Sequence, residues 1–264
     1  MSFFVAAAWS ILAVYGFLLL GALFASTHTP PHIDLVTGFL CAAIAFLVTL
    51  IFVTQIHEKD RPLTEVFGLR RPSVSLCLIA IALGLALQGP LSLITDAILR
   101  RFPLSADEAA EYADQFNVPL LHQKIATVVT AGLLGPLVEE LFFRGALFRG
   151  LRRQHPLGLT LVGVSLLFAA SHHEPRWFFP LFLAGLAIGY VRALAGSLWP
   201  GVLLHASYNT VAVVFGVRHG LDADMLTRSQ NLAAAFASVG LLVLYRAVAL
   251  RSETSAQARA EDAV

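Results

Sequence analysis

The feature that most constrains this chain is a succession of long apolar segments, several of which carry no charged residue. A helix rises about 1.5 Å per residue, so roughly 20 apolar residues cross the ~30 Å hydrocarbon layer of a bilayer. Backbone N–H and C=O groups have no water to bind within that layer, so a spanning segment must satisfy them internally as a helix. The chain is therefore predicted to be an all-α, polytopic membrane protein.

Eight segments are candidate spans, and the fifth and sixth are the shortest of them. The eight are Phe3–Ala25, Leu35–Ile56, Leu76–Leu99, Ile125–Leu147, Leu157–His172, Trp177–Leu194, Leu198–Val217 and Leu232–Leu250. They predict one transmembrane domain over residues 1–250. Residues 251–264 are rich in Ala, Ser, Glu and Arg and are predicted to form a disordered cytoplasmic tail. The first segment lacks a preceding basic region, so we expect a span and not a cleaved signal peptide.

Composition and charge agree with this class. Hydrophobic residues make up 57% of the 264 residues and charged residues 13%, with a mean hydropathy of +0.75. The net charge of +1 gives no indication of nucleic acid as a partner, whereas membrane lipid is implied by the spans. Cys41 and Cys77 both lie in apolar segments, which predicts small buried side chains rather than a disulfide or a metal site.

The distribution of Lys and Arg between the connecting segments predicts the orientation. With the N-terminus inside, eleven of these residues lie on the inner side and six on the outer side. Basic loops are retained in the cytoplasm. We therefore expect both termini to be cytoplasmic, in a bacterial inner membrane.

Ionisable residues inside a membrane span are costly and usually functional. The fourth span contains Glu139, Glu140 and Arg144. Glu140 and Arg144 are spaced i, i+4 with the acid first, the preferred order for an ion pair on a helix. Glu139 lies about 100° further round the helix, so it needs another partner and is the better candidate for a general base. The alternative is a charge cluster that only holds helices together.

Two further spans present polar pairs at the same spacing. Phe168 and His172 share one face of the fifth span, and His205 and Asn209 share one face of the seventh. Of the adjacent His172 and His173, only one can point where Phe168 points. For each pair, the alternative is a structural role: histidine at the headgroup level for the first, hydrogen bonding between helices for the second.

These side chains suit peptide hydrolysis, which needs an activated water and donors for the tetrahedral oxyanion. Glu139 with His172 could activate water, and His205 with Asn209 could hold the oxyanion. A catalytic zinc site built from the glutamate and two histidines is the alternative, although Asn is a poor zinc ligand. No His-Glu-x-x-His segment and no Gly-x-Ser-x-Gly segment occurs in the sequence.

The three motifs resemble the CPBP family of CAAX proteases and bacteriocin-processing intramembrane proteases, also called the Abi family. Its pattern is Glu-Glu-x-x-x-Arg, Phe-x-x-x-His and His-x-x-x-Asn on separate membrane helices, and this chain matches all three. The segment from Phe67 to Pro72 is similar to a further family feature, and the resemblance covers roughly residues 65–216.

The resemblance implies an eight-helix fold around a polar catalytic cavity. It also implies an intramembrane endopeptidase acting on a membrane-associated protein or peptide, with prenylated CAAX-like proteins as one class. The family has been described both as metalloproteases and as glutamic proteases, and the residues above favour the glutamic type without a bound cofactor, with zinc as the alternative. The catalytic residues would be Glu139, His172, His205 and Asn209, supported by Glu140, Arg144 and Phe168.

Two non-protease hypotheses compete with this one. A membrane scaffold would use the same fold without chemistry. A transporter would use the polar cavity as a solute path, but the sequence shows no matching inverted halves. The physiological substrate, the cleavage site and the oligomeric state are not indicated by any motif.

Overall fold

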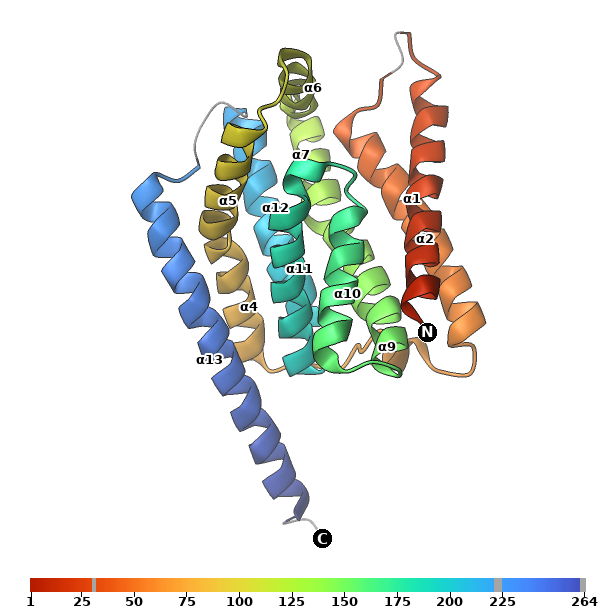
Figure 1. Ribbon diagram of the computed structural model, residues 1–264, viewed down its shortest axis with the longest axis vertical. Coiled ribbons are helices and arrows are strands. Elements are labelled where there is room, and N and C mark those ends of the chain that lie inside the picture. The colour runs from red at the N-terminus through yellow and green to blue at the C-terminus, as the bar shows by residue number, and fades with distance from the viewer. Residues whose placement is uncertain (30–31, 221–224, 262–264) are drawn as a thin grey trace.

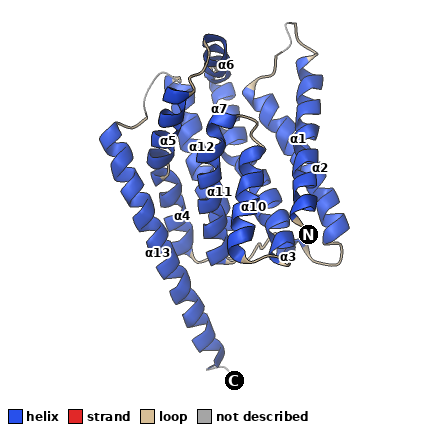
Figure 2. Ribbon diagram, in the orientation of Figure 1, coloured by secondary structure: helices blue, strands red, loops and turns tan. Residues whose placement is uncertain are grey.

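A computed structural model describes residues 1–29, 32–220 and 225–261, and the regular structure in these ranges is helical (Figures 1 and 2). The elements are α1 Phe3–Ala25, α2 Leu35–His57, α3 Leu63–Val66, α4 Val74–Ala86, α5 Gln88–Arg101, α6 Ala106–Phe116, α7 Leu121–Val129, η1 Thr130–Leu134, α8 Gly135–Glu140, η2 Leu141–Leu147, α9 Phe148–Arg152, α10 Leu157–Ala170, α11 Pro175–Ala195, α12 Trp199–His219 and α13 Arg228–Glu261. The elements labelled η are π-helical turns. The predicted all-α class is confirmed.

Within the described ranges, seven helices or continuous helical segments are long and apolar enough to cross a membrane. The fifth predicted span, α10, is not among these seven, because it has only 14 residues. At about 1.5 Å per residue it is shorter than the hydrocarbon layer, and it ends at Ala170 rather than His172. The chain is an integral, polytopic membrane protein, and His172 lies in the turn that follows a short span.

The helices form one bundle with the segment Leu121–Arg152 at its centre. The pair α1 and α2 lies on one side of the bundle and α13 lies on the other (Figure 1). Within the bundle, α8 packs against both α2 and α12, and α12 packs against α4. Large apolar side chains such as Phe4 on α1 and Phe236 on α13 point away from the protein, as expected where lipid is the solvent.

The third predicted span is two helices, α4 and α5, that meet at Leu87. Pro90 has no N–H to donate to the carbonyl one turn earlier, which favours a break here. Gln88 is buried at the break, where its Nε2 donates to the backbone oxygen of Tyr208 on α12 at 2.7 Å. The break therefore ties this span to the helix that carries His205.

The C-terminal segment differs from the prediction. The backbone of α13 is helical from Arg228 to Glu261, whereas residues 251–264 were expected to be disordered. Ala, Glu, Gln and Arg are among the best helix formers, so a helix that leaves the membrane can continue into this segment. Residues 262–264 lie outside the described part of the chain.

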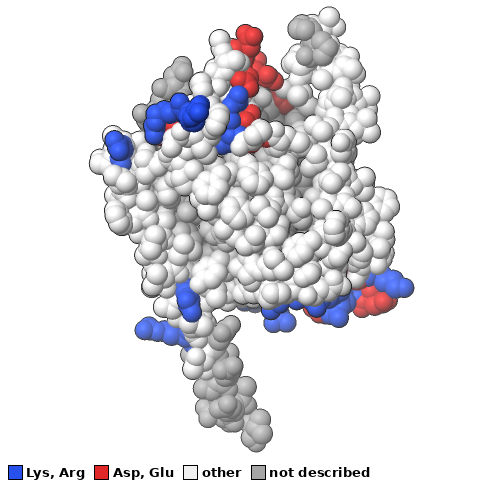
Figure 3. Space-filling model, in the orientation of Figure 1, with Lys and Arg blue, Asp and Glu red and all other residues white. Residues whose placement is uncertain are grey.

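Charged side chains gather at the two ends of the bundle and leave an uncharged band between them (Figure 3). The ammonium group of Met1 donates to the backbone oxygen of Gly150 at 3.1 Å, which places the N-terminus beside α9. The last turns of α13 project beyond the same face (Figure 1). Both ends of the chain lie on the same face because the seven long spans and the short span α10 make an even number of membrane crossings.

Candidate active site

The segment that carries Glu139, Glu140 and Arg144 is flanked by two π-helical turns, η1 and η2. Such turns are rare and occur frequently at functional sites. Pro136 explains the first of them, because its ring would clash with the carbonyl four residues earlier in a regular α-helix. The N–H of Gly135 donates to the carbonyl of Thr130, which is the wider π spacing.

Glu140 and Arg144 form the predicted ion pair, with 2.7 Å between Oε1 and Nη1, and both side chains are fully buried. Arg144 also donates from Nη2 to the backbone oxygen of Gly185 at 3.1 Å. Its guanidinium carbon lies 4.4 Å from the centre of the Phe168 ring. Removing one partner of a buried pair leaves an uncompensated charge, so these contacts fix α8, α10 and α11 relative to one another.

His205 connects the two glutamates. Its Nδ1 lies 3.0 Å from Oε1 of Glu140, and its Nε2 lies 3.8 Å from Oε2 of Glu139. Glu139 is 21% exposed, whereas Glu140 is completely buried. Glu139 also lines a small cavity between α2 and α8 whose other walls are apolar. Glu139 is therefore the accessible acid of the pair. Its partner, which the sequence did not identify, is His205.

Phe168 lies between the two histidines. Its ring centre is 4.9 Å from that of His172 and 5.6 Å from that of His205, both in edge-on geometry. The Nδ1 of His172 lies 2.9 Å from the backbone oxygen of Phe168. A carbonyl can only accept, so Nδ1 carries a proton and Nε2 of a neutral ring is left as an acceptor.

The neighbouring His173 points elsewhere. It has a left-handed backbone conformation with φ of 60°, and its exposed side chain lies near Phe17 of α1. Of the two adjacent histidines, His172 is therefore the one that faces Phe168. No hydrogen bond or ion pair joins His172 to Glu139 among the described residues.

Asn209 lies one turn after His205, and its amide nitrogen donates to the backbone oxygen of Ala131 at 3.3 Å. Thr210 donates in the same way to the backbone oxygen of Gly132 at 3.2 Å. Pro136 lacks an N–H, so this turn is one backbone donor short, and side chains of α12 donate to its carbonyls. The second N–H of the Asn209 amide is not used in this bond.

Two further features support the site, and only the second of them, the segment that begins at Phe67, was marked by the sequence. Arg192 of α11 belongs to none of the three motifs, but its Nε donates to the backbone oxygen of Arg144 at 3.0 Å. Gly68 has a φ of 66°, and its carbonyl accepts from the N–H of Leu198 at 3.0 Å. The loop that contains Phe67 and Gly68 therefore braces the turn between α11 and α12 instead of lying free in solvent.

The donor set does not form a ready metal site. In the described part of the chain, no group of three His, Cys, Asp or Glu side chains lies close enough to hold a metal ion. Glu139 and His205 approach each other, but His205 uses Nδ1 on Glu140, and His172 is linked to them only through the ring of Phe168.

The fold and the site together define a polytopic membrane protein with an acid, two histidines and an amide gathered at membrane depth. The family model described as type II CAAX prenyl endopeptidase, Rce1-like, matches residues 121–211. This range contains all three polar motifs, so the match supports the predicted resemblance to the CAAX proteases.

A protein of Escherichia coli described as an uncharacterized 24.3 kDa protein is 35% identical over 97 residues. The matched region covers 35% of this chain and 45% of that protein, so the chain spans less than half the length of this relative. No solved structure matches the chain.

Proposed function

We propose that this protein is an intramembrane endopeptidase that hydrolyses peptide bonds of a membrane-associated protein or peptide. The observation that carries the proposal is the unequal state of two adjacent glutamates. Glu140 is buried and neutralised by Arg144, while Glu139 is partly open and meets the free nitrogen of the histidine that Glu140 holds. This arrangement orients a base and an acid group without exposing either charge fully to lipid.

The charges of this cluster favour proton transfer. Glu139, Glu140 and Arg144 sum to −1, so a single proton held between Glu139 and Nε2 of His205 brings the cluster to neutrality. Neutral clusters are favoured where water is scarce. Glu139 would accept a proton from a water molecule while the remaining hydroxide attacks the carbonyl carbon. The same proton would then pass to the leaving amine nitrogen as the peptide bond breaks.

The remaining groups would hold the reacting atoms. His172 offers Nε2 as an acceptor for the attacking water, and Asn209 offers its unused amide N–H to the oxyanion. His205 would be the second oxyanion donor when Nε2 is protonated. Preorganised donors of this kind contribute roughly 10²–10³-fold each to the rate of acyl transfer.

The description of the matched family model names CAAX prenyl endopeptidases, which supports prenylated proteins as the class of substrate. Prenylated peptides are therefore the first substrates to test, beside unprenylated membrane peptides. A zinc-dependent version of the same protease is the second mechanism, and a scaffold without chemistry is the alternative function.

The decisive variant is Glu139→Gln, which keeps the shape of the side chain and removes the base. We expect it to lower cleavage of a prenylated peptide by purified protein by about 10²–10⁴-fold, since that is the usual contribution of a general base. Glu111→Gln, an exposed change of the same kind on α6, should leave cleavage unchanged.

Retained activity in Glu139→Gln would refute the proposed role. Each protein is also assayed with phenanthroline. Loss of wild-type cleavage on addition of the chelator would replace the metal-free mechanism with the zinc-dependent one. A wild type that cleaves none of the peptides would favour the scaffold.

A further inference from the structure

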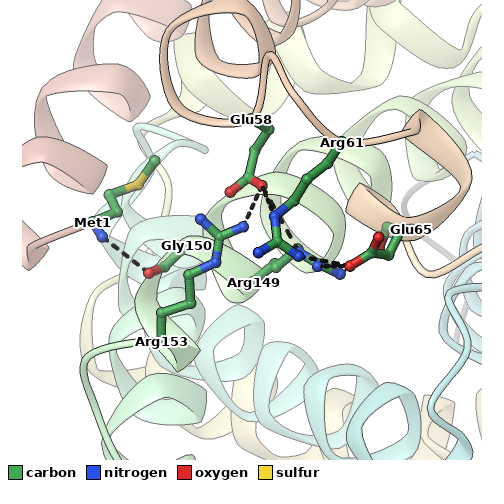
Figure 4. Close-up of polar contacts among 7 residues, drawn as sticks. All are labelled: Met1, Glu58, Arg61, Glu65, Arg149, Gly150 and Arg153. Carbon is green, nitrogen blue, oxygen red and sulfur yellow. Dashed lines mark hydrogen bonds and ion pairs between the residues drawn. The ribbon is translucent and has the colours of Figure 1, made fainter.

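Four arginine side chains surround a second pocket, on the face where both termini lie. The pocket has a volume of about 430 Å³ and is lined by Arg61, Arg149, Arg152 and Arg153. Three of these residues are drawn in Figure 4 with their contacts. None belongs to the candidate active site, and no sequence motif singled them out.

The cationic charge of this pocket is only partly compensated. Glu58 is almost completely buried and accepts from Arg153, with Arg61 at 3.8 Å and Arg149 at 3.9 Å. Glu65 pairs with Arg61 at 2.7 Å and with Arg149 (Figure 4). Four guanidinium groups therefore face two carboxylates, which leaves an excess of two positive charges.

Donors remain available in the pocket. Arg152 is exposed, and its Nη1 donates to the backbone oxygen of His155 at 2.8 Å. It has no carboxylate partner among the described residues. The Nε of Arg149 is buried without a hydrogen-bond partner. A guanidinium carries five N–H donors in a planar fork that matches the oxygens of a phosphate.

The position of the pocket relative to the bilayer indicates the source of such a phosphate. The apolar helices α1 and α2 and the central segment Leu121–Arg152 all have an end at this face. The indole nitrogen of Trp9, near the start of α1, donates to His57, the last residue of α2, at 3.0 Å. Trp side chains concentrate at the boundary between hydrocarbon and headgroups. The pocket therefore lies at the level of the lipid phosphates.

We propose that the four-arginine pocket binds the phosphate of an anionic phospholipid of the adjacent leaflet. The excess positive charge selects a lipid with a net negative headgroup over a zwitterionic one. Bound phosphate would satisfy Arg152 and the spare donors of Arg149 and would join the ends of α2 and α9. This site is independent of the protease activity proposed above.

The test uses the full chain in a neutral detergent and native mass spectrometry to count bound lipid. Phosphatidylglycerol is titrated against the wild type, Arg152→Gln and Arg71→Gln, with phosphatidylcholine as the zwitterionic probe. Arg71 is an exposed arginine of the loop before α4 that does not line the pocket. We expect phosphatidylglycerol to bind the wild type more tightly than phosphatidylcholine. Arg152→Gln should weaken that binding about fivefold, the loss typical of one basic residue at an anionic surface.

Arg71→Gln should bind as the wild type does, and Arg152→Lys should recover part of the loss. Equal weakening in Arg71→Gln and Arg152→Gln would overturn the proposal, because it would mean diffuse attraction to the whole face. Undiminished binding in Arg152→Gln would overturn it as well. Inorganic phosphate that competes with phosphatidylglycerol at equal concentration would show a site for free phosphate and would overturn the lipid assignment.

Discussion

Asn209 and Thr210 are adjacent residues with the same structural task and different positions relative to the candidate active site. Each donates from α12 to a carbonyl of η1, the turn that Pro136 leaves one backbone donor short. His205 lies one turn before Asn209 on the same face of the helix. Substituting each residue in turn therefore separates a structural role from a catalytic one.

Asn209→Ala and Thr210→Ala should both lower the free energy of unfolding, by about 1–3 kcal/mol, since each leaves a buried carbonyl without its donor. Only Asn209→Ala should also lower kcat, by roughly 10²–10³-fold, because it removes an oxyanion donor. The measurement is peptide cleavage beside thermal unfolding in detergent. Equal loss of kcat in the two variants would mean that Asn209 acts only as a brace.

At this scale, much of the site could be predicted from spacing alone. The i, i+4 rule places Glu140 on Arg144 and Phe168 on His172, because a helix determines which side chains are neighbours. The rule is silent on contacts between helices. It could not show that His205 bridges both glutamates, nor that Arg192 reaches the backbone of Arg144.

Among the elements, α4 and α12 approach each other closely at Gly84. A Cβ at Gly84 would overlap the backbone oxygen of Leu204 and the side chain of Ser207, one on each side of His205 and Ala206. Helices approach this closely only where small residues lie at the contact. Gly84 therefore determines how closely α4 can approach α12, the helix that carries His205 and Asn209.

Gly84→Ala should lower the free energy of unfolding by about 1–3 kcal/mol and reduce cleavage, because α12 must move to admit the methyl group. Gly158→Ala is the matched control. It lies in α10 with open space around its Cα, so the same change should be neutral or slightly stabilising. Unfolding in denaturant measures both, and an unaffected Gly84→Ala would mean that the two helices can separate without cost.

The short amphipathic helix α6 is attached to the bundle by an ion pair between Glu108 and Arg176, with 2.9 Å between their nearest atoms. Its first turn is closed by a capping box of Ser105 and Glu108. The backbone N–H of Ser105 and the guanidinium of Arg176 lower the pKa of Glu108 below the usual range of a glutamate. Stability from this contact is present above that range and is lost as the pH falls through the lowered pKa.

Glu108→Gln should therefore speed amide hydrogen exchange across Ala106–Phe116 at pH 7. Glutamine can still close the capping box, so the change isolates the ion pair. Wild type and variant, compared at the same pH, should converge in acid as the carboxylate is protonated. Identical exchange rates at pH 7 would mean that Arg176 does not hold α6.

The boundaries of elements were less predictable than their existence. The span expected at Ile125–Leu147 is part of a helical segment from Leu121 to Arg152 with two π turns. Hydropathy indicates where lipid contact ends. The helix continues beyond that point as α9, because Arg149 forms ion pairs with Glu58 and Glu65. Hydropathy also gives no indication that Val66, in the connection between α2 and α4, is fully buried.

For the whole molecule, the excess of basic residues predicts which face is cytoplasmic. Both termini lie on the face that carries the four arginines, so a C-terminal fusion reports the orientation of the entire bundle. We expect green fluorescent protein fused after Val264 to fluoresce and alkaline phosphatase at the same position to be inactive. The reverse pattern would invert the topology and place the basic pocket outside.

The burial of Glu140 against Arg144 on one helix has a consequence for biogenesis. A charged residue at the centre of a span adds about 2.5–3.5 kcal/mol to the cost of entering the membrane from the translocon. The segment Leu121–Arg152 has a mean hydropathy of 1.5, against 2.6 for Leu35–His57, so it is a poor substrate for insertion. Because acid and base lie one turn apart, the segment can enter already neutralised, before the ribosome has synthesised α12. His205 arrives later, on α12, and completes the proton-transfer cluster when only α13 has still to enter the bilayer.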